Sequence, residues 1–319
     1  MTGNDRRPLG ASGIEVMPLC FGGNVFGWTV DERTSFDLLD AFVDAGFDFI
    51  DTADVYSKWA PGHAGGESET IIGRWFAAGG RRDRVVLATK VGLDMGEGRK
   101  GLRADWIRRS VEDSLRRLQT DRIDLYQSHT DDAGVPQEET LRAYQDLIAA
   151  GKVRAIGASN FSPERLESAR RLARDAGLPA YETLQPEYNL YSREGFEASL
   201  QAICERERIA VIPFYGLASG FLSGKYRSEA DAGKSVRGAG IAKKYLNERG
   251  LRILRALDAV AARTGATCSQ VAIAWLASRP TIAAPIVSAT SLAQLDDLIA
   301  ATRLRLDPQA MADLAQASA

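Results

Sequence analysis

The sequence predicts a single-domain (β/α)8 TIM barrel over residues 1–319, with a short N-terminal hairpin and extended loops at the C-terminal face. The first observation is that eight short apolar segments alternate with amphipathic helical segments, which implies parallel strands joined by right-handed crossovers. The second is that no Gly-x-Gly-x-x-Gly follows any strand, which argues against the rival doubly wound sheet. A length of 319 residues allows one barrel or two ordinary domains, and the strand count favours one.

The elements follow one another in regular order. A hairpin over residues 7–16 precedes the first buried strand, Leu19–Phe21, which Gly22 and Gly23 close. Seven further strands are expected at 47–51, 84–90, 123–129, 155–160, 182–185, 209–214 and 282–286. Helices are expected at about 31–45, 67–76, 103–118, 138–150, 163–176, 196–205, 247–264, 269–278 and 291–300. A Gly/Lys/Ser-rich stretch from 215 to about 240 separates the seventh strand from the helices that precede the eighth.

Composition and charge exclude several functions. The net charge of -2 gives no bias toward nucleic acid or anionic membranes, and no apolar run approaches the roughly 18 residues that span a bilayer. The first 13 residues lack an apolar signal core, and the three dispersed cysteines are expected to be reduced thiols. The two histidines, His63 and His129, are too few for sites that bind metal through several histidines. We therefore expect a cytoplasmic protein with a small-molecule substrate, whose oligomeric state the sequence leaves open.

Polar residues stand at successive strand ends. In a barrel all strand tips face one mouth, so the side chains that end these strands should converge, namely Asp51, Lys90, His129, Asn160 and Gln185. Each alone has an ordinary explanation: an aspartate caps a helix, a lysine reaches solvent, and a lone histidine is satisfied structurally. Their joint appearance favours an active site.

These residue types suit proton delivery to a carbonyl oxygen, with Tyr56 as the acid. Bringing a tyrosine pKa from about 10 to neutrality takes roughly 4 kcal/mol. A lysine ammonium at about 4 Å supplies that order of energy at an effective dielectric near 20, so Lys90 is expected to lower the pKa of Tyr56. Asp51 would keep Lys90 charged, and His129 would either orient the substrate oxygen or help to relay the proton.

The ordered set Asp51, Tyr56, Lys90 and His129, preceded by Gly-Phe-x-Phe-Ile-Asp-Thr-Ala, resembles the aldo-keto reductase superfamily. The resemblance runs from about Arg7 to Thr302. It implies a (β/α)8 barrel, NADPH-dependent reduction of aldehydes or ketones to alcohols without metal, and the four catalytic roles just described.

The resemblance also implies a cofactor site. Ser159, Asn160 and Gln185 match residues that hold the nicotinamide carboxamide, and Phe214 matches an aromatic that stacks on its ring. Tyr215 and Gly216 stand where the family often has Ser-Pro. The loop over the pyrophosphate corresponds to Leu217, Ser219, Gly220 and Lys225, and Gly23 and Asp51 are expected to contribute to the same site.

The segment 287–298 aligns with the part of the family that grips the adenosine 2′-phosphate, yet it holds no Arg or Lys. Ser288, Thr290, Gln294 and Asp297 are the polar residues expected to contact the cofactor there. NADP(H) is the expected cofactor, and NAD(H) is the alternative. Trp28 and Trp59 are candidate walls of the substrate pocket, with barrel packing or a surface loop as their alternatives.

Two other functions use the same residues. One is a regulatory redox sensor that binds NADPH and turns over slowly. The other is a lyase in which Lys90 forms a Schiff base with its substrate.

Overall fold

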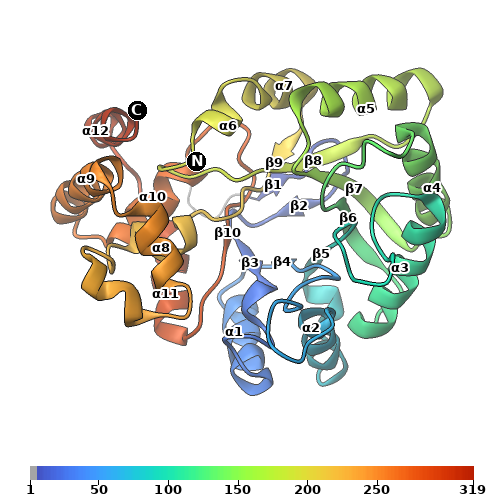
Figure 1. The fold of residues 1–319 in the computed structure, drawn as a ribbon, viewed down its shortest axis with the longest axis horizontal. Coiled ribbons are helices and arrows are strands. Elements are labelled where there is room, and N and C mark those ends of the chain that lie inside the picture. Colours follow the sequence, from blue (N-terminus) through green and yellow to red (C-terminus); the bar gives the residue numbers. More distant parts are fainter. Residues whose placement is uncertain (1–5) are drawn as a thin grey trace.

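The computed structural model describes residues 6–319. The first 13 residues were expected to lack a signal core, and residues 1–5 of that stretch lie outside the described part. Eight parallel strands form one sheet in the order β10-β3-β4-β5-β6-β7-β8-β9, which curls into a barrel with helices outside it (Figure 1). Between β9 and β10 the ring closes through the parallel bridge of Val211 with Ile282 and a 2.9 Å bond from Ile286 N to Pro213 O. The (β/α)8 prediction is confirmed.

The strands of the barrel are short. They are β3 (Cys20–Gly22), β4 (Phe49–Asp51), β5 (Val86–Val91), β6 (Ile123–Ser128), β7 (Val153–Ser159), β8 (Tyr181–Gln185), β9 (Ala210–Val211) and β10 (Ile286–Val287). Strand β9 is shorter than the strand expected at 209–214. Strand β10 is shorter than the strand expected at 282–286 and lies toward its C-terminal end. Pro213 and Pro285 lie in these segments, and proline has no N–H to donate to a ladder.

The expected hairpin is present as β1 (Arg7–Pro8) paired antiparallel with β2 (Glu15–Val16). Its apolar side chains Leu9, Ile14 and Val16 are buried in one cluster with interior residues of the barrel strands. Arg7 donates to Ala277 O at 2.9 Å and to Ile282 O at 2.8 Å. The hairpin is thus fixed to the barrel core and to the chain that leads into β10.

The helices surround the strands as the apolar periodicity predicted. They are α1 (Glu32–Asp44), α2 (Glu67–Ala77), α3 (Ala104–Leu118), α4 (Gln137–Ala149), α5 (Pro163–Ala176), α6 (Glu194–Glu197), α7 (Leu200–Glu207), α8 (Gly238–Tyr245), α9 (Glu248–Thr264), α10 (Cys268–Ala277), α11 (Leu292–Ala301) and α12 (Pro308–Ala317). Four 3-10 turns complete the list: η1 (Gly23–Val25), η2 (Arg81–Arg84), η3 (Ala218–Ser223) and η4 (Glu229–Lys234).

Two helix predictions need correction. The single helix expected over 196–205 is two helices, because Ser199, at φ -150° and ψ -43°, leaves the helical region between α6 and α7. Helices α8 and α12 were not expected, although in α12 Asp307 caps the helix by accepting from Ala310 N at 2.7 Å and Pro308 opens it. No helix within residues 6–319 is long and apolar enough to cross a membrane.

Candidate active site

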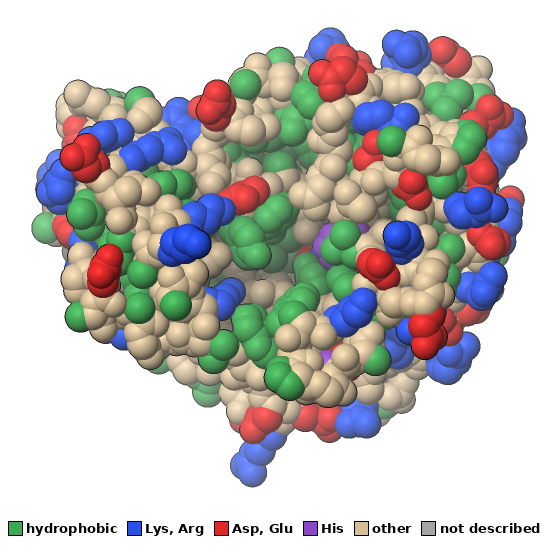
Figure 2. Space-filling view, viewed as in Figure 1, with side chains coloured by type: hydrophobic (Ala, Val, Ile, Leu, Met, Phe, Trp, Pro, Cys, Tyr) green, Lys and Arg blue, Asp and Glu red, His purple; other side chains and the backbone are tan. Residues whose placement is uncertain are grey.

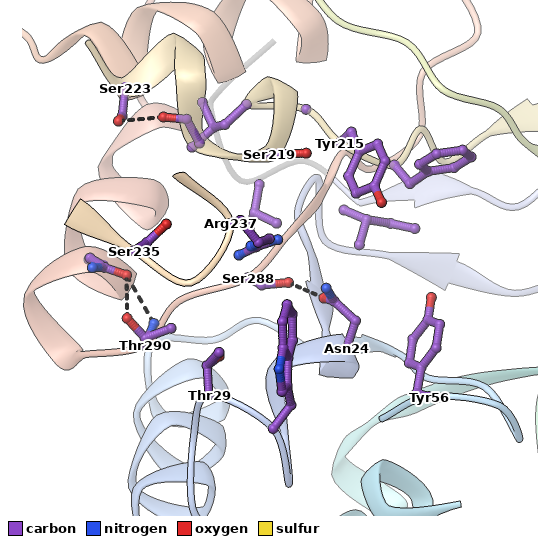
Figure 3. Close-up of a pocket in the computed structure, with 18 of the residues that line it drawn as sticks. Asn24, Thr29, Tyr56, Tyr215, Ser219, Ser223, Ser235, Arg237, Ser288 and Thr290 are labelled. Atoms are coloured by element: carbon purple, nitrogen blue, oxygen red, sulfur yellow. Dashed lines mark hydrogen bonds between the residues drawn. The ribbon is translucent and has the colours of Figure 1, made fainter. Parts of the chain in front are cut away.

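A cavity of about 930 Å³ opens among the loops that follow the carboxyl ends of the strands. Figure 2 shows it as a hollow in the face of the molecule viewed in Figure 1, with apolar side chains lining its walls. The size lies within the range of small-molecule and cofactor sites. Figure 3 shows Tyr56 on one side of the cavity, Ser235 and Thr290 on the other, and Arg237 between them.

Beneath the cavity lies a fully buried ion pair, Lys90 on β5 and Asp51 at the end of β4. Lys90 Nζ donates to Asp51 Oδ2 at 2.6 Å, to Thr52 O at 2.8 Å and to the Tyr56 hydroxyl at 2.8 Å. Only an ammonium has three hydrogens to give, so Lys90 is charged here. Burial lowers the pKa of Lys90, and Asp51 acts against that change.

Both oxygens of Asp51 are occupied. Oδ2 accepts from Lys90 and, at 3.2 Å, from Tyr56. Oδ1 accepts from Gln185 at 2.9 Å and from Gln127 at 3.1 Å. These four hydrogen bonds satisfy the buried carboxylate.

Tyr56 lies in the loop after β4 and faces the cavity. The expectation that Lys90 lowers its pKa is wrong for this site. Burial, and after it the charge and hydrogen bond of Asp51, raise the pKa of Tyr56 well above 10. The charge of Lys90 is matched by Asp51, so the phenol lies next to a neutral pair and keeps its proton.

His129 follows β6 and lines the cavity, with its ring 5.9 Å from that of Tyr56 in an edge-on arrangement. Burial, and secondly the charge of Lys90, lower the pKa of His129 well below 6.5, so the ring is neutral. Its Nδ1 is buried without a hydrogen-bond partner among residues 6–319. A neutral imidazole can donate one hydrogen bond, which fits an orienting role better than the delivery of a net proton.

Three polar residues expected near a carboxamide lie together at the ends of β7 and β8. Ser159 pairs with Gln185 in the sheet register, and its hydroxyl donates to Gln185 O at 2.8 Å. Asn160 adopts a positive φ of 55° and donates to His129 O at 2.9 Å. All three line the cavity. The expected contributor Gly23 does not; a Cβ there would lie 2.8 Å from Ser68 Oγ, so close packing explains that glycine.

The loop after β9 follows the cavity wall from Phe214 to Lys225. The Phe214 and Tyr215 rings are 5.0 Å apart and edge-on, and Tyr215 is the more exposed. Positive φ angles recur at Tyr215, Ala218, Ser219 and Gly220. Such strained backbone clusters at ligand-binding loops. The expected residues of this loop that line the cavity are Phe214, Tyr215, Gly216, Leu217, Ser219, Gly220 and Lys225.

The far end of the cavity is formed by Ser288, Thr290, Gln294 and Asp297, all expected from the sequence. The Ser288 hydroxyl lies 2.7 Å from Asn24 Oδ1 (Figure 3). Gln294 Oε1 accepts from the N–H and the hydroxyl of Thr290. Asp297 accepts from Thr267 and Gln270 at the start of α10, so its carboxylate also has a structural role.

The sequence reasoning missed part of the positive charge that lines the cavity. Lys225, Lys234 and Arg237, here called the cationic rim, all line the cavity, and only Lys225 was expected. The signal is present as cations interspersed with serines and glycines in the stretch 215–240, whereas the family resemblance directs attention to segment 287–298.

Trp28 and Trp59 both line the cavity, as expected of pocket walls. Their rings meet edge-on at 5.6 Å, and Trp59 meets Tyr56 at 6.0 Å. The Arg237 guanidinium lies 5.5 Å from the Trp28 ring centre, which links the rim to this aromatic wall.

No group of three or more His, Cys, Asp or Glu side chains in the part of the chain that the structure describes could hold a metal ion.

Comparison with known proteins agrees with this site. The model of the Aldo/keto reductase family matches residues 18–319. The uncharacterized oxidoreductase YrpG of Bacillus subtilis is 37% identical over 94% of this chain and 92% of its own length. The aldo-keto reductase YhdN of the same organism is 36% identical over 95% and 89%. A probable voltage-gated potassium channel subunit beta of Oryza sativa is 34% identical over 90% and 88%. The chain therefore belongs to the aldo/keto reductase family and is an oxidoreductase of that family.

Proposed function

We propose that the protein is an NADP(H)-dependent oxidoreductase that reduces aldehyde or ketone carbonyls to alcohols, or catalyses the reverse reaction, with Tyr56 as the general acid and base. The observation that carries this proposal is the arrangement around the Tyr56 hydroxyl. Lys90 donates to that oxygen at 2.8 Å, so the one hydrogen of the hydroxyl remains to be donated. Tyr56 also faces the cavity, where a substrate oxygen can replace Asp51 as its acceptor.

In reduction, neutral Tyr56 gives its proton to the substrate oxygen, and Lys90 holds the resulting phenolate. The high pKa of Tyr56 means that the proton leaves only as negative charge develops on the substrate oxygen. His129, neutral and at the cavity wall, donates a hydrogen bond that orients the carbonyl. Asp51 keeps the ammonium charged throughout.

The cavity fits a nicotinamide dinucleotide, which supplies the hydride when bound. Ser159, Asn160 and Gln185 offer hydroxyl and amide groups to the carboxamide, and Phe214 or Tyr215 offers an aromatic face. The loop containing Leu217, Ser219 and Gly220 would lie along the pyrophosphate. The cationic rim supports NADP(H) over NAD(H), since cations that line the cavity suit an additional phosphate. Lys234 is paired with Asp231 at 2.7 Å, which leaves Lys225 and Arg237 as the better candidates.

The two rival functions are less well supported. A lyase needs a neutral, free amine on Lys90, whereas all three of its hydrogens are engaged and its pair with Asp51 keeps it protonated. A redox sensor would use the same residues, and resemblance to a protein named as a potassium channel subunit is the one observation in its favour. Turnover rates separate it from an enzyme.

The test is Tyr56→Phe, assayed by NADPH consumption with a panel of aldehydes and ketones. We expect turnover to fall by about 10²- to 10⁴-fold, as for loss of a general acid, while NADPH affinity changes less than about threefold. Full turnover in Tyr56→Phe would overturn the assignment. Turnover by the wild type that is extremely slow for every carbonyl, together with very slow cofactor release, would favour the sensor.

A further inference from the structure

One buried polar side chain next to the catalytic residues has no role in the reaction described above. Gln127 lies near the end of β6, is fully buried and does not line the cavity. It is the register partner of Lys90 on β5 and of Gly157 on β7. A buried amide without partners is costly, so the hydrogen bonds of Gln127 indicate what it does.

Gln127 belongs to a polar layer inside the barrel. In such barrels, alternate strands contribute the side chains of one layer, which is usually filled by branched apolar residues. Here β4, β6 and β8 contribute Asp51, Gln127 and Gln185. The three side chains form a closed set of hydrogen bonds: Gln127 to Asp51 at 3.1 Å, Gln185 to Asp51 at 2.9 Å, and Gln185 Nε2 to Gln127 Oε1 at 3.2 Å.

The carboxylate fixes how both amides are oriented. A charged carboxylate only accepts hydrogen bonds, so both amide nitrogens must face Asp51 Oδ1. The second hydrogen of Gln185 Nε2 then goes to Gln127 Oε1. Both donors of Gln185 are thus used inside the barrel. The side-chain oxygen of Gln185, Oε1, takes no hydrogen bond from residues 6–319. It remains for a donor in the cavity that Gln185 lines.

The packing around Gln127 limits its movement. A Cβ on Gly157 would lie 3.0 Å from Gln127 Cγ and 2.2 Å from Thr183 Oγ1. The glycine therefore leaves the space that the glutamine occupies, and a second conformation for the side chain would have to displace neighbours in a close-packed layer.

We propose that Gln127 is a positioning residue that couples the catalytic carboxylate to the cofactor site. It supplies one of the two donors to Asp51 Oδ1, and it holds the Gln185 amide so that its carbonyl oxygen accepts the N–H₂ of a nicotinamide carboxamide. This inference rests on the proposed function, because it takes the nicotinamide to bind at Ser159, Asn160 and Gln185.

The first test compares binding of NADP⁺ with binding of its 3-acetylpyridine analogue, whose methyl ketone has no N–H to donate. In the wild type we expect NADP⁺ to bind about threefold to tenfold more tightly, as for one hydrogen bond. In Gln127→Leu the Gln185 amide keeps its bond to Asp51 but loses the acceptor of its second hydrogen, so it is less fixed and we expect this ratio to fall toward one. Thr183→Val is the matched control, because Thr183 Oγ1 lies beside Gly157 close to Gln127 without touching Asp51, and the variant should keep the wild-type ratio.

The second test is the pH profile of kcat in Gln127→Glu. While the introduced carboxyl group is protonated, it can donate to Asp51 and accept from Gln185 as the glutamine does. Once ionised, it places a second carboxylate beside Asp51, and two adjacent carboxylates share a proton rather than both ionise. We expect kcat near the wild-type value at low pH and an added decline as pH rises, together with a fall in the NADP⁺ to 3-acetylpyridine analogue binding ratio over the same pH range; a purely structural residue would leave that ratio unchanged.

The outcomes separate this inference from the proposed function. A wild type that binds neither nucleotide would overturn both. Wild-type binding with a ratio near one, an unchanged ratio in Gln127→Leu, or a wild-type pH profile in Gln127→Glu would overturn the positioning role alone. If Gln127→Leu does not fold, Gln127→Glu still decides, because its protonated form preserves every bond of the layer at low pH and the change on raising the pH can then be measured on a folded protein.

Discussion

The two ends of the cavity are built in different ways. The catalytic end rests on strand side chains that are buried and mutually hydrogen-bonded, namely Asp51, Lys90, Gln127 and Gln185, here called the polar floor. The cationic rim is carried by a loop; Lys225 and Lys234 are exposed, and Arg237 is half-buried against Trp28. A buried network is coupled, so the loss of one member changes the others, whereas exposed charges act separately and are screened by salt.

The largest effect that this comparison predicts is that of Lys90→Met. Removing the ammonium leaves Asp51 buried without its cation, and breaking a buried pair in this way costs about 3–5 kcal/mol. We expect urea unfolding to show a loss of that size, together with a fall in turnover of at least about 10²-fold.

The double variant Lys90→Met/Asp51→Asn shows whether the floor is coupled. Removing both charges should restore most of the lost stability and none of the turnover. If the double variant lost as much stability as the two single variants together, the polar floor would be no more coupled than the cationic rim.

A second prediction concerns Asp54, which stands two residues before Tyr56 and contacts Ser110 on α3. Its side chain is buried and accepts from Ser110 at 3.2 Å, and its Oδ1 has no partner among residues 6–319. Burial, and secondly the charge of Glu69, raise the pKa of Asp54 to about 7, although Arg117 acts against them. One pKa unit is worth about 1.4 kcal/mol, so an ionised Asp54 costs about 4 kcal/mol above pH 7.

The sign of the effect follows from proton binding. Between about pH 4 and pH 7, folded Asp54 holds a proton that the unfolded chain has lost, so the wild type loses stability as pH rises through this window. Asp54→Asn removes that loss. Its stability relative to the wild type should therefore increase from pH 4 to pH 7 and then stay level, as measured by urea unfolding at each pH.

Asp124→Asn is the control with the opposite sign. Burial acts to raise the pKa of Asp124, but Arg82, the Leu87 N–H and Arg154 hold it below its ordinary value. Its stabilising effect is lost as pH falls, so Asp124→Asn should be most damaging at neutral pH. If both variants showed the same pH dependence, the burial of Asp54 would not be the cause.

The same contrast explains what the sequence could predict. Asp51, Lys90, His129 and Gln185 each end an apolar run, and the barrel topology then brings them together. Gln127 was missed because it stands inside the expected strand 123–129, and His129 is the polar residue that ends this strand. Its role depends on the layer that it shares with β4 and β8.

The cationic rim was harder to predict because its position depends on how a loop folds back. The stretch 215–240 has no periodicity that would place Lys234 or Arg237 over a particular strand end. The pKa of Tyr56 was misjudged for a related reason. The sequence indicated that Lys90 and Asp51 would both be near, but the burial of the phenol, which is the first cause of its raised pKa, and the hydrogen bond of Tyr56 to Asp51 depend on how the loop after β4 folds.

The smallest predicted effect is at the rim, in Arg237→Ala. If its guanidinium contacts the 2′-phosphate, the variant should bind NADPH about tenfold more weakly, or about 1.4 kcal/mol, and bind NADH within about twofold of the wild type. Lys243→Ala is the matched control, since it removes an exposed cation six residues further along and outside the cavity.

Fluorescence titration at low and high salt gives the decisive reading. A rim cation acts through a partly screened charge, so the difference between wild type and Arg237→Ala should shrink as salt increases. Equal weakening for NADPH and NADH would instead place Arg237 at a group shared by both nucleotides, and the preference for NADP(H) would then have to come from Thr290 and Gln294 at the start of α11.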